Sequence, residues 1–264
     1  MMQAVTHRSS RQSTIVTLVT VRLDSTRLPG KALSPIHGRA SLGRLLDGVR
    51  RATIPGSVVV CTTARPVDDP LEAFAALEGV ECYRGPTDDV LSRMIGAAER
   101  HGASTVVRVT GDDPLSDPEY IDCAVELHAS AEAEFTRTEG LPFGVGREVL
   151  EVSALQRADR MIDQAPFREY LTWFFDDPSR FRVAVLEAEE RHRRPQYRLT
   201  LDYAEDLSVL NEIFRRLEQR ANPVRLDDVI SLLDADPTLA ARNSHCKAVA
   251  FKDVFSSEVL PPRP

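Results

Sequence analysis

The sequence predicts an α/β protein of Rossmann-like architecture, in which helices flank a mostly parallel central sheet. Two runs rich in β-branched residues, 14–21 (TIVTLVTV) and 57–63 (SVVVCTT), are typical of strands that are buried on both faces. Segments with the apolar spacing of amphipathic helices follow them, at 41–52 and 68–79. A chain of 264 residues with 42% hydrophobic content is large enough to bury one such core.

The first half of the chain alternates strictly between strands and helices. Two further strands, 80–85 and 104–110, are separated by a helix at 87–102. Thr87 is the expected N-cap of this helix, and Gly102 is its expected C-terminal stop. Because each strand is followed by a helix, the strands are expected to be parallel and joined by crossovers.

The second half is less regular. We expect the following segments in it: an extended stretch at 133–140, a Gly-rich stretch at 141–151, helices at 153–162 and 167–175, and an extended stretch at 181–189. A last strand should end at Asp202. These segments should add strands to the sheet and build a small lobe over roughly residues 133–198. The economical organisation is therefore one domain over residues 14–250, with a flexible leader at 1–13 and a tail at 251–264.

The composition argues against several classes of protein. A formal net charge of −7 argues against nucleic acid as the main partner. No stretch approaches the ~18 consecutive apolar residues of a membrane span, and the N-terminus lacks the apolar core of a signal peptide. The four cysteines are scattered without a CxxC pair, so neither a zinc site nor a disulfide framework is indicated. We therefore expect a cytoplasmic protein with no membrane partner.

Basic residues gather near the N-terminus. Residues 1–55 carry nine Lys and Arg against two Asp and Glu, which makes this segment +7 and the remainder −14. Several of these cations are expected to form a solvated face of the first helix: Arg39, Arg44, Arg50 and Arg51. Others lie in the loop 20–33 (TVRLDSTRLPGKAL), which follows the first strand. A polar loop at the carboxyl end of a buried parallel strand is where α/β proteins bind small ligands.

This loop carries the groups that a polyphosphate requires. Arg22, Arg27 and Lys31 offer two guanidiniums and an ammonium, and Gly30 allows close approach of the backbone. Neither the GxxxxGK[ST] motif of a Walker A loop nor the GxGxxG dinucleotide fingerprint is present. The loop therefore predicts a phosphate site of another kind.

Two acidic motifs could hold a metal ion beside these phosphates. Strand alternation places Arg108, Thr110 and Asp112 on one side of the fourth strand, with Asp112 at its carboxyl end. Mg²⁺ takes one or two protein carboxylates together with phosphate oxygens and water, so Asp112 and Asp202 are the candidate ligands. Three other acids are interpreted as caps of the helices that follow them: Asp113, Glu205 and Asp206.

Four motifs occur in a recognisable order and spacing: VRLDSTRLPGKAL (21–33), YRGPTDDVLSR (83–93), VVRVTGDDPLSDPEYID (106–122) and YRLTLDYAEDL (197–207). Together they resemble the acidic-sugar cytidylyltransferases, most closely the spore-coat-polysaccharide branch, with CMP-sialate and CMP-Kdo synthetases as more distant relatives. The resemblance covers roughly residues 14–220. It implies a Rossmann-like nucleotidyltransferase that transfers CMP from CTP to an acidic small-molecule acceptor, releases pyrophosphate and forms a homodimer.

The resemblance also implies roles for individual residues. It places Arg22, Arg27 and Lys31 on the CTP phosphates, and it places Asp112 and Asp202 on a shared Mg²⁺. Catalysis would rest on Arg22, Lys31 and Asp112. The other nucleotide contacts that it implies are Ser25, Gly30, Thr110 and Gly111, with Arg84 near the cytosine.

The lobe that should bind the acceptor departs from the family pattern. Relatives commonly carry an Arg-Glu-His-Val run where this chain has FREYLTWFF (167–175), so Tyr170 stands in place of a histidine. The candidate acceptor-binding residues are Arg147, Glu148, Arg168, Tyr170 and Arg198. A phosphonate oxygen is already anionic near neutral pH, whereas a sugar hydroxyl must lose a proton. The missing histidine therefore favours a phosphonate over a sugar acid, and both stay open.

Two other classes of function also stay open. The acidic pair at 112–113 could mimic the metal-binding motif of a Rossmann-like glycosyltransferase. A nucleotide-sugar donor, however, does not need so many cations at the first strand. A non-catalytic nucleotide-binding protein is expected to lack Lys31 or one of the two aspartates, and all three are present.

Overall fold

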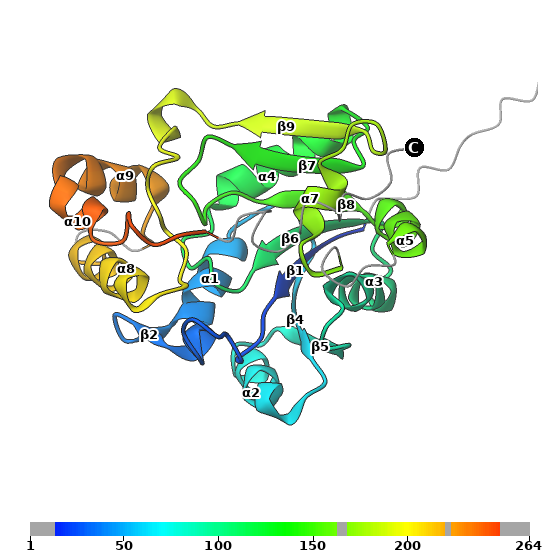
Figure 1. Cartoon of the computed structure of the whole chain (residues 1–264), viewed down its shortest axis with the longest axis horizontal. Coiled ribbons are helices and arrows are strands. Elements are labelled where there is room, and N and C mark those ends of the chain that lie inside the picture. The colour runs from blue at the N-terminus through cyan, green and yellow to red at the C-terminus, as the bar shows by residue number, and fades with distance from the viewer. Residues whose placement is uncertain (1–13, 163–167, 220–222, 249–264) are drawn as a thin grey trace, which may run out of the picture.

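A seven-stranded sheet forms the centre of the protein, with the strand order β5-β4-β1-β6-β8-β7-β9 (Figure 1). The structure, a computed structural model, describes residues 14–162, 168–219 and 223–248. The strands are β1 (Ile15–Thr20), β4 (Ser57–Thr63), β5 (Glu81–Gly85), β6 (Thr105–Thr110), β7 (Phe135–Glu139), β8 (Glu148–Glu151) and β9 (Val183–Glu187). A separate two-stranded ribbon is made by β2 (Pro35–Ile36) and β3 (Arg39–Ala40).

Only one strand of this sheet runs against the others. β1 pairs in parallel with β4 and β6, β4 with β5, and β7 with β9, whereas β8 is antiparallel to both β6 and β7. The predicted mostly parallel sheet is therefore confirmed. The chain first runs outward from β1 to β5 and then returns to β6 on the other side of β1, so a topological switch point lies between β1 and β6. Open α/β sheets bind ligands at the carboxyl ends of the strands at such a point.

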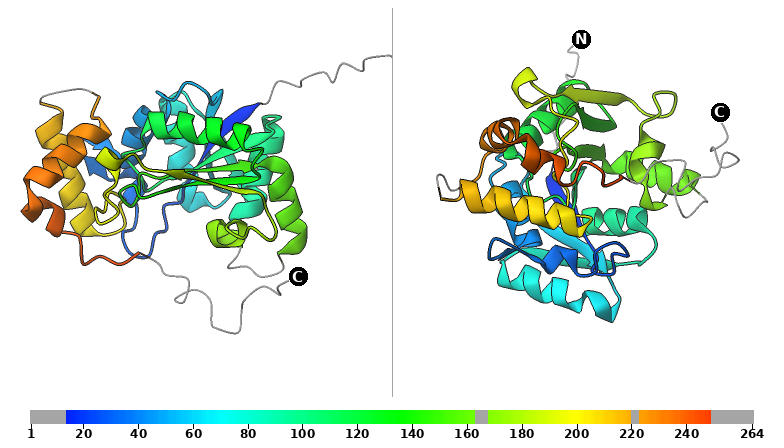
Figure 2. Two further views of the ribbon diagram at one scale, coloured as in Figure 1. Left: turned by 90° about the horizontal axis from the view of Figure 1, so that it is seen from above. Right: turned by 60° about the vertical axis from the view of Figure 1, so that its left-hand side comes forward.

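Helices cover both faces of the sheet (Figure 2). Cores on the two faces are separate: α3 (Val90–Arg100), α5 (Val152–Met161) and α7 (Leu171–Phe175) share one, and α1 (Ser41–Val49), α2 (Asp69–Leu77) and α4 (Pro118–Ser130) share the other. At the end of the molecule that carries the 197–207 segment lie α8 (Ala204–Leu217), α9 (Leu226–Ala235) and α10 (Pro237–Ala241). Short 3₁₀ turns occupy Lys31–Leu33, Pro66–Asp68 and Glu190–His192.

The first strand is buried on both faces, as predicted. Val16 and Leu18 pack into the core that contains α3, while Val19 packs into the core that contains α1. The core around α3 also takes in Phe135 of β7 and Leu150 of β8. The second half of the chain thus extends the sheet of the first half.

Two local features differ from the sequence prediction, and one agrees with it. Asp89, not Thr87, caps α3, because the Asp89 carboxylate accepts the backbone N–H of Ser92 at 2.8 Å. Gly102 does follow α3, with a φ of +61° that suits glycine. The segment before Asp202 is not a strand of the sheet: it crosses the strand ends and makes one isolated bridge, between Phe143 and Arg198.

Among the described residues, none of the helices combines the length and the apolar character that a bilayer crossing requires.

Candidate active site

The loop after β1 turns back on itself at a glycine. The N–H of Gly30 donates to the carbonyl of Leu23 at 2.9 Å, and Gly30 has a φ of +70°, which few other residues adopt without strain. The next residue, Lys31, begins a 3₁₀ turn and is only 9% exposed. The turn therefore carries the lysine side chain into the protein instead of leaving it in solvent.

Lys31 joins the two predicted metal ligands. Its Nζ donates to Asp112 Oδ2 at 2.7 Å and to Asp202 Oδ1 at 2.8 Å. Burial would lower the pKa of Lys31, but the charges and hydrogen bonds of the two aspartates outweigh burial and raise it. Burial likewise opposes ionisation of Asp112, and the adjacent ammonium outweighs it, so the pKa of Asp112 is lowered. Near neutral pH this cluster therefore contains an ammonium beside the ionised carboxylate of Asp112.

Asp202 is held from several directions. Its carboxylate accepts from Arg27 Nη2 at 2.6 Å and from Arg198 Nη2 at 2.9 Å. Asp206, which is fully buried, accepts the backbone N–H groups of Asp202 and Tyr203 at 2.9 and 3.0 Å. The predicted capping role is thus confirmed for Asp206, which fixes the backbone at Asp202 where α8 begins.

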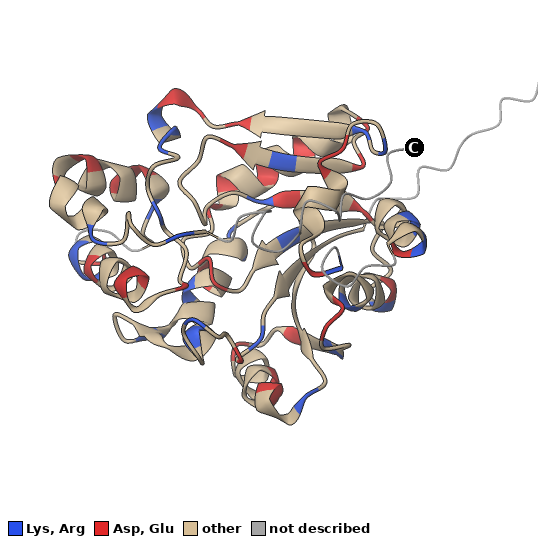
Figure 3. Cartoon of the chain, in the orientation of Figure 1, with Lys and Arg blue, Asp and Glu red and all other residues tan. Residues whose placement is uncertain are grey.

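The loops after β1 and β6 approach each other closely. The N–H of Gly111 donates to the Thr20 carbonyl at 2.9 Å, and a Cβ at Gly111 would lie 2.5 Å from Val21 Cβ. Only glycine permits this approach, which places Asp112 opposite the basic loop. Arg27 and Lys31 are paired with Asp202 and Asp112, so this region combines basic and acidic residues. Figure 3 shows how both kinds of residue are distributed along the ribbon.

Two pockets adjoin at this cluster. The first, which we call the loop pocket, has a volume of about 410 Å³ and contains eight predicted residues: Arg22, Ser25, Arg27, Lys31, Thr110, Gly111, Asp112 and Tyr170. The second, which we call the lobe pocket, has a volume of about 510 Å³ and adds Arg147, Glu148 and Asp202. Both are lined by Arg27, Arg108, Thr110, Asp112 and Tyr170. Two ligands could therefore meet beside Asp112.

Arg22 connects the basic loop to the lobe. Its Nη2 donates to Glu169 Oε1 at 2.9 Å, and its Nε lies 3.5 Å from Asp24 Oδ1. Glu169 belongs to the same segment as Tyr170, which stacks on Trp173 with ring centroids 5.2 Å apart. The segment that departs from the family pattern thus contributes lining residues to both pockets.

The prediction that Asp113 caps the next helix is wrong. Asp117 caps α4, while Asp113 is buried and accepts from Thr110 Oγ1 at 2.6 Å and from Arg147 Nη1 at 3.3 Å. Burial and the charge of Asp112 raise the pKa of Asp113 to about 7, against the opposing effect of Arg147. Asp113 therefore lies inside the protein, where it contacts Arg147 at the lobe pocket.

Not all predicted residues line the pockets. Arg84 donates to Glu72 Oε2 at 2.8 Å and lies 2.7 Å from Asp69 Oδ1, so the structure ties it to α2 and not to the loop pocket. Arg168 donates to Asp89 Oδ2 at 2.7 Å, at the start of α3. Arg198 and Gly30 also do not line the pockets. Arg198 contacts Asp202, and Gly30 allows the turn of the basic loop.

The structure also brings in two residues to which sequence reasoning gave no role in the site, although it placed Arg108 on the same side of the strand as Thr110 and Asp112. Arg108 lines both pockets and donates to Glu148 Oε2 at 2.5 Å. Arg93 lines the loop pocket from α3. The sequence could have indicated Arg93, because this arginine occupies a position among the apolar residues of an amphipathic helix.

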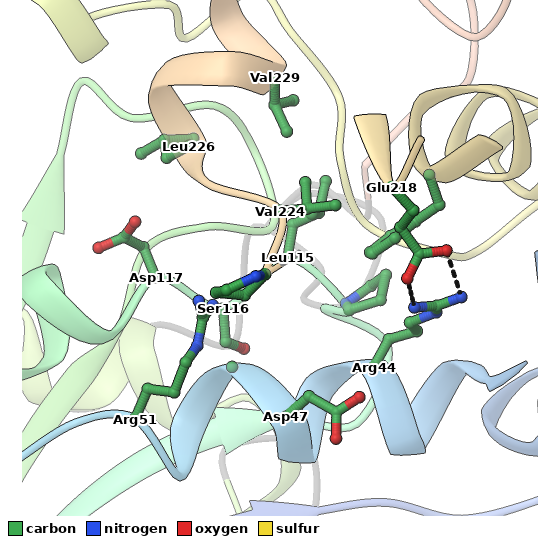
Figure 4. A pocket seen from close by; sticks show the side chains of 14 residues that line it. Arg44, Asp47, Arg51, Leu115, Ser116, Asp117, Glu218, Val224, Leu226 and Val229 are labelled. Atoms are coloured by element: carbon green, nitrogen blue, oxygen red, sulfur yellow. Dashed lines mark hydrogen bonds and ion pairs between the residues drawn. The ribbon is translucent and has the colours of Figure 1, made fainter. Parts of the chain in front are cut away.

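A separate small cavity of about 50 Å³ lies behind the loop that follows Asp112 (Figure 4). Arg44 and Glu218 pair beside it, with Nη2 3.0 Å from Oε2. Arg44 is 9% exposed, so the expectation of a solvated basic face is wrong for this residue, because Glu218 and the Ile36 carbonyl hold it inside. No predicted site residue lines this cavity.

The donor set fits Mg²⁺. Two carboxylates already share one cation, the ammonium of Lys31, so both reach a common point at short range. Among the residues that the structure describes, no group of three or more His, Cys, Asp or Glu could hold a metal ion. Mg²⁺ suits such a site because one or two protein carboxylates suffice when substrate phosphates supply the remaining oxygens.

The sheet order, with the loop pocket and the lobe pocket at its switch point, is that of a Rossmann-like fold, and solved nucleotidyltransferase structures share it. A cytidylyltransferase structure from Leptospira borgpetersenii superposes with a TM-score of 0.80 and 26% identity over 90% of this chain and 99% of that chain. The chain belongs to the cytidylyltransferase family, whose model matches residues 16–228.

Other comparisons agree with the predicted resemblance. The chain is 32% identical to the spore coat polysaccharide biosynthesis protein SpsF of Bacillus subtilis, over 86% of this chain and 96% of that protein. It is 32% identical to a 3-deoxy-manno-octulosonate cytidylyltransferase of Geobacter sulfurreducens over 42% of this chain and 44% of that protein. The fold also matches CMP:2-keto-3-deoxy-manno-octonic acid synthetase complexed with CTP, with a TM-score of 0.60, 14% identity, and coverage of 77% and 99% of the two chains.

Proposed function

We propose that this cytidylyltransferase moves CMP from CTP to an acidic acceptor and releases pyrophosphate. The observation that carries the proposal is the ammonium of Lys31 held between Asp112 and Asp202 where two pockets meet. The loop pocket would take CTP, because it contains the basic loop. The lobe pocket would take the acceptor. Membership of the family supports CTP as the nucleotide.

The reaction calls for charge neutralisation more than for covalent chemistry. Attack of an acceptor oxygen on the α-phosphorus builds negative charge on the phosphate oxygens and on the departing pyrophosphate. Lys31, Arg22 and Arg27 would bind these oxygens. Each cation is now paired with a carboxylate, which keeps it oriented before the triphosphate takes over as its partner. Mg²⁺ held by Asp112 and Asp202 would supply Lewis-acid polarisation of the same oxygens.

Two kinds of acidic acceptor are candidates. The Geobacter relative is named for 3-deoxy-manno-octulosonate, a sugar acid, and this favours a sugar acid. Among the described residues, no histidine lines either pocket, and this favours a phosphonate, whose oxygen needs no base. Arg147 and Glu148 line the lobe pocket and are the residues proposed to contact the acceptor.

A pyrophosphate-release assay tests the proposal. The protein is incubated with Mg²⁺ and each of ATP, CTP, GTP and UTP, together with a short alkylphosphonate or a nonulosonic acid. We expect release with CTP and with one acceptor class. The proposal would be contradicted if none of the four nucleotides gave pyrophosphate. It would also be contradicted if pyrophosphate were released at the same rate without the acceptor. Sugar-acid turnover without phosphonate turnover would exclude the phosphonate and leave the cytidylyl transfer intact.

A further inference from the structure

Asn243 joins the site from a part of the chain that lies beyond the family match. It follows α10, outside residues 16–228 that the family model matches, and its side chain is buried. Its Nδ2 donates to Asp206 Oδ1 at 2.8 Å and to the Arg198 carbonyl at 3.0 Å. The segment after α10 therefore contributes an amide to the buried polar cluster that supports Asp202.

Arg198 connects this cluster to Asp202. Its Nε donates to Asp206 Oδ1 at 2.9 Å, and its Nη2 is shared between Asp206 Oδ2 at 3.1 Å and Asp202 Oδ2 at 2.9 Å. The other oxygen of Asp202, Oδ1, accepts from Arg27 and Lys31. Arg198 thus holds one oxygen of Asp202 from behind, and this leaves the other oxygen facing the cations of the two pockets.

The amide of Asn243 affects how the Arg198 guanidinium is shared. Asp206 is fully buried, and a buried carboxylate depends on its hydrogen-bond donors because it has lost its water. Without the amide, Asp206 Oδ1 loses one donor, and the charge of Asp206 must be balanced more closely by the guanidinium. The guanidinium is then drawn toward Asp206 and away from Asp202.

We propose that Asn243 is a positioning residue that holds Asp202, through Asp206 and Arg198, in the orientation that Mg²⁺ and CTP require. This inference rests on the proposed function. Asn243 lines neither pocket, so its effect on a ligand has to pass through Asp202. Side chains that orient a metal ligand from outside commonly change metal affinity. Loss of the amide should therefore weaken binding of CTP together with Mg²⁺ and spare binding of CTP alone.

Calorimetric titration of the full chain with CTP separates these two effects, once with Mg²⁺ and once with EDTA in its place. The variants are Asn243→Ala, which removes the amide, and Asn243→Asp, which keeps the shape of the side chain but turns a carboxylate toward Asp206. Asn211→Ala is the matched control. Asn211 of α8 also makes two hydrogen bonds, since it accepts the His37 N–H at 2.7 Å and donates to the Leu207 carbonyl at 2.9 Å.

We expect Asn243→Ala to weaken binding of CTP with Mg²⁺ by about 10-fold and Asn243→Asp by up to about 100-fold, the range for residues that orient a metal ligand. The aspartate should have the larger effect because two like charges then face each other inside the protein. Binding of CTP in EDTA should stay the same for both variants. The control should bind CTP as the wild type does under both conditions.

Other outcomes overturn the inference. Equal weakening with Mg²⁺ and with EDTA would assign Asn243 a general structural role, and unchanged binding with Mg²⁺ would show that it does not act on Asp202. Thermal unfolding checks that each variant is folded. If Asn243→Ala is unfolded, Asn243→Asp, which keeps the side-chain volume, decides.

A crystal structure of the folded variant without ligand gives an independent answer. An Asp202 carboxylate that has rotated away from Arg198 supports the inference, and an unchanged carboxylate overturns it. A wild type that binds no CTP would refute the proposed function, and the orientation of Asp202 in the variant would still decide the role of Asn243. CTP binding with Mg²⁺ that is indifferent to Asn243 refutes the inference alone.

Discussion

At the scale of single residues, the site is organised around the ammonium of Lys31, which two aspartates hold at 2.7 and 2.8 Å. We predict that Lys31→Ala lowers kcat by about 10²-fold or more, the scale of losing one preorganised donor to a developing charge. The measurement is steady-state pyrophosphate release with CTP and Mg²⁺, and circular dichroism checks that the variant is folded. Near-normal turnover would show that Lys31 does not act on the phosphates.

The two aspartates should respond differently to loss of charge. Asp112→Asn and Asp202→Asn should both abolish activity at low Mg²⁺ and recover part of it in excess Mg²⁺, because an amide oxygen is still a ligand but carries no charge. Asp202→Asn should also reduce the free energy of unfolding more than Asp112→Asn does, since Asp202 is paired with Arg27 and Arg198 as well. Activity titrated against Mg²⁺ and urea unfolding provide the two measurements. Equal effects on stability would mean that these arginine contacts are not formed in solution.

At the scale of single elements, the start of α3 provides a comparison between two neighbouring positions. Asp89 accepts the Ser92 N–H, whereas Thr87 contributes no cap. Asp89→Ala should therefore lower the free energy of unfolding by about 0.5–2 kcal/mol, the range for a lost N-cap. Thr87→Ala is the matched control and should change it by less than about 0.5 kcal/mol. Urea unfolding of both variants measures these changes. A larger loss of free energy of unfolding for Thr87→Ala than for Asp89→Ala would show that Thr87 is the N-cap, as the sequence predicted.

The same cap should make stability depend on pH. Burial raises the pKa of Asp89, but the Ser92 and Arg168 contacts outweigh burial and bring it below the ordinary value of 3.8. A depressed pKa stabilises the folded state above the unfolded-state value, and this contribution is lost as the pH falls through the folded-state value. The advantage of the wild type over Asp89→Asn, which keeps a capping side chain, should thus be constant near pH 6 and shrink towards about pH 3. If the difference in free energy of unfolding between the wild type and Asp89→Asn grew as the pH fell, the pKa of Asp89 would be raised in the folded state and not lowered.

At the scale of the whole molecule, one core crosses both halves of the chain. Val16 and Leu18 of β1 share it with Phe135, Phe174 and Phe175 of the second half. We therefore predict a single cooperative unfolding transition. Trp173 is the sole tryptophan and lies in the lobe, so its fluorescence reports on that region while far-UV circular dichroism reports on all helices. The two urea transitions should coincide, and an earlier fluorescence transition would show that the lobe unfolds separately.

Much of the fold was accessible from local sequence patterns. The strands predicted at 57–63 and 104–110 are present in the structure as Ser57–Thr63 and Thr105–Thr110, since β-branched residues suit a strand that is covered on both faces. The segment before Asp202 has the same strand-like pattern but is not part of the sheet. Its backbone instead hydrogen-bonds to the loops at the strand ends, where the Leu201 N–H donates to the Asp112 carbonyl at 2.8 Å. The pattern of apolar residues indicates that a segment is buried. It does not identify which part of the protein covers that segment.

By itself, the sequence determined the mostly parallel sheet, the basic loop after the first strand and the residues Lys31, Asp112 and Asp202, because strand ends and charged motifs are local properties of the chain. Only the tertiary structure decided which of these charges meet. It turned Asp113 into the protein, drew Arg84 to α2 and, among the described residues, left Arg93 in the loop pocket without an ion pair to a carboxylate. The physical reason is that the energy of a buried charge depends on its nearest partners, which here come from segments tens of residues apart, and no local pattern specifies such pairs.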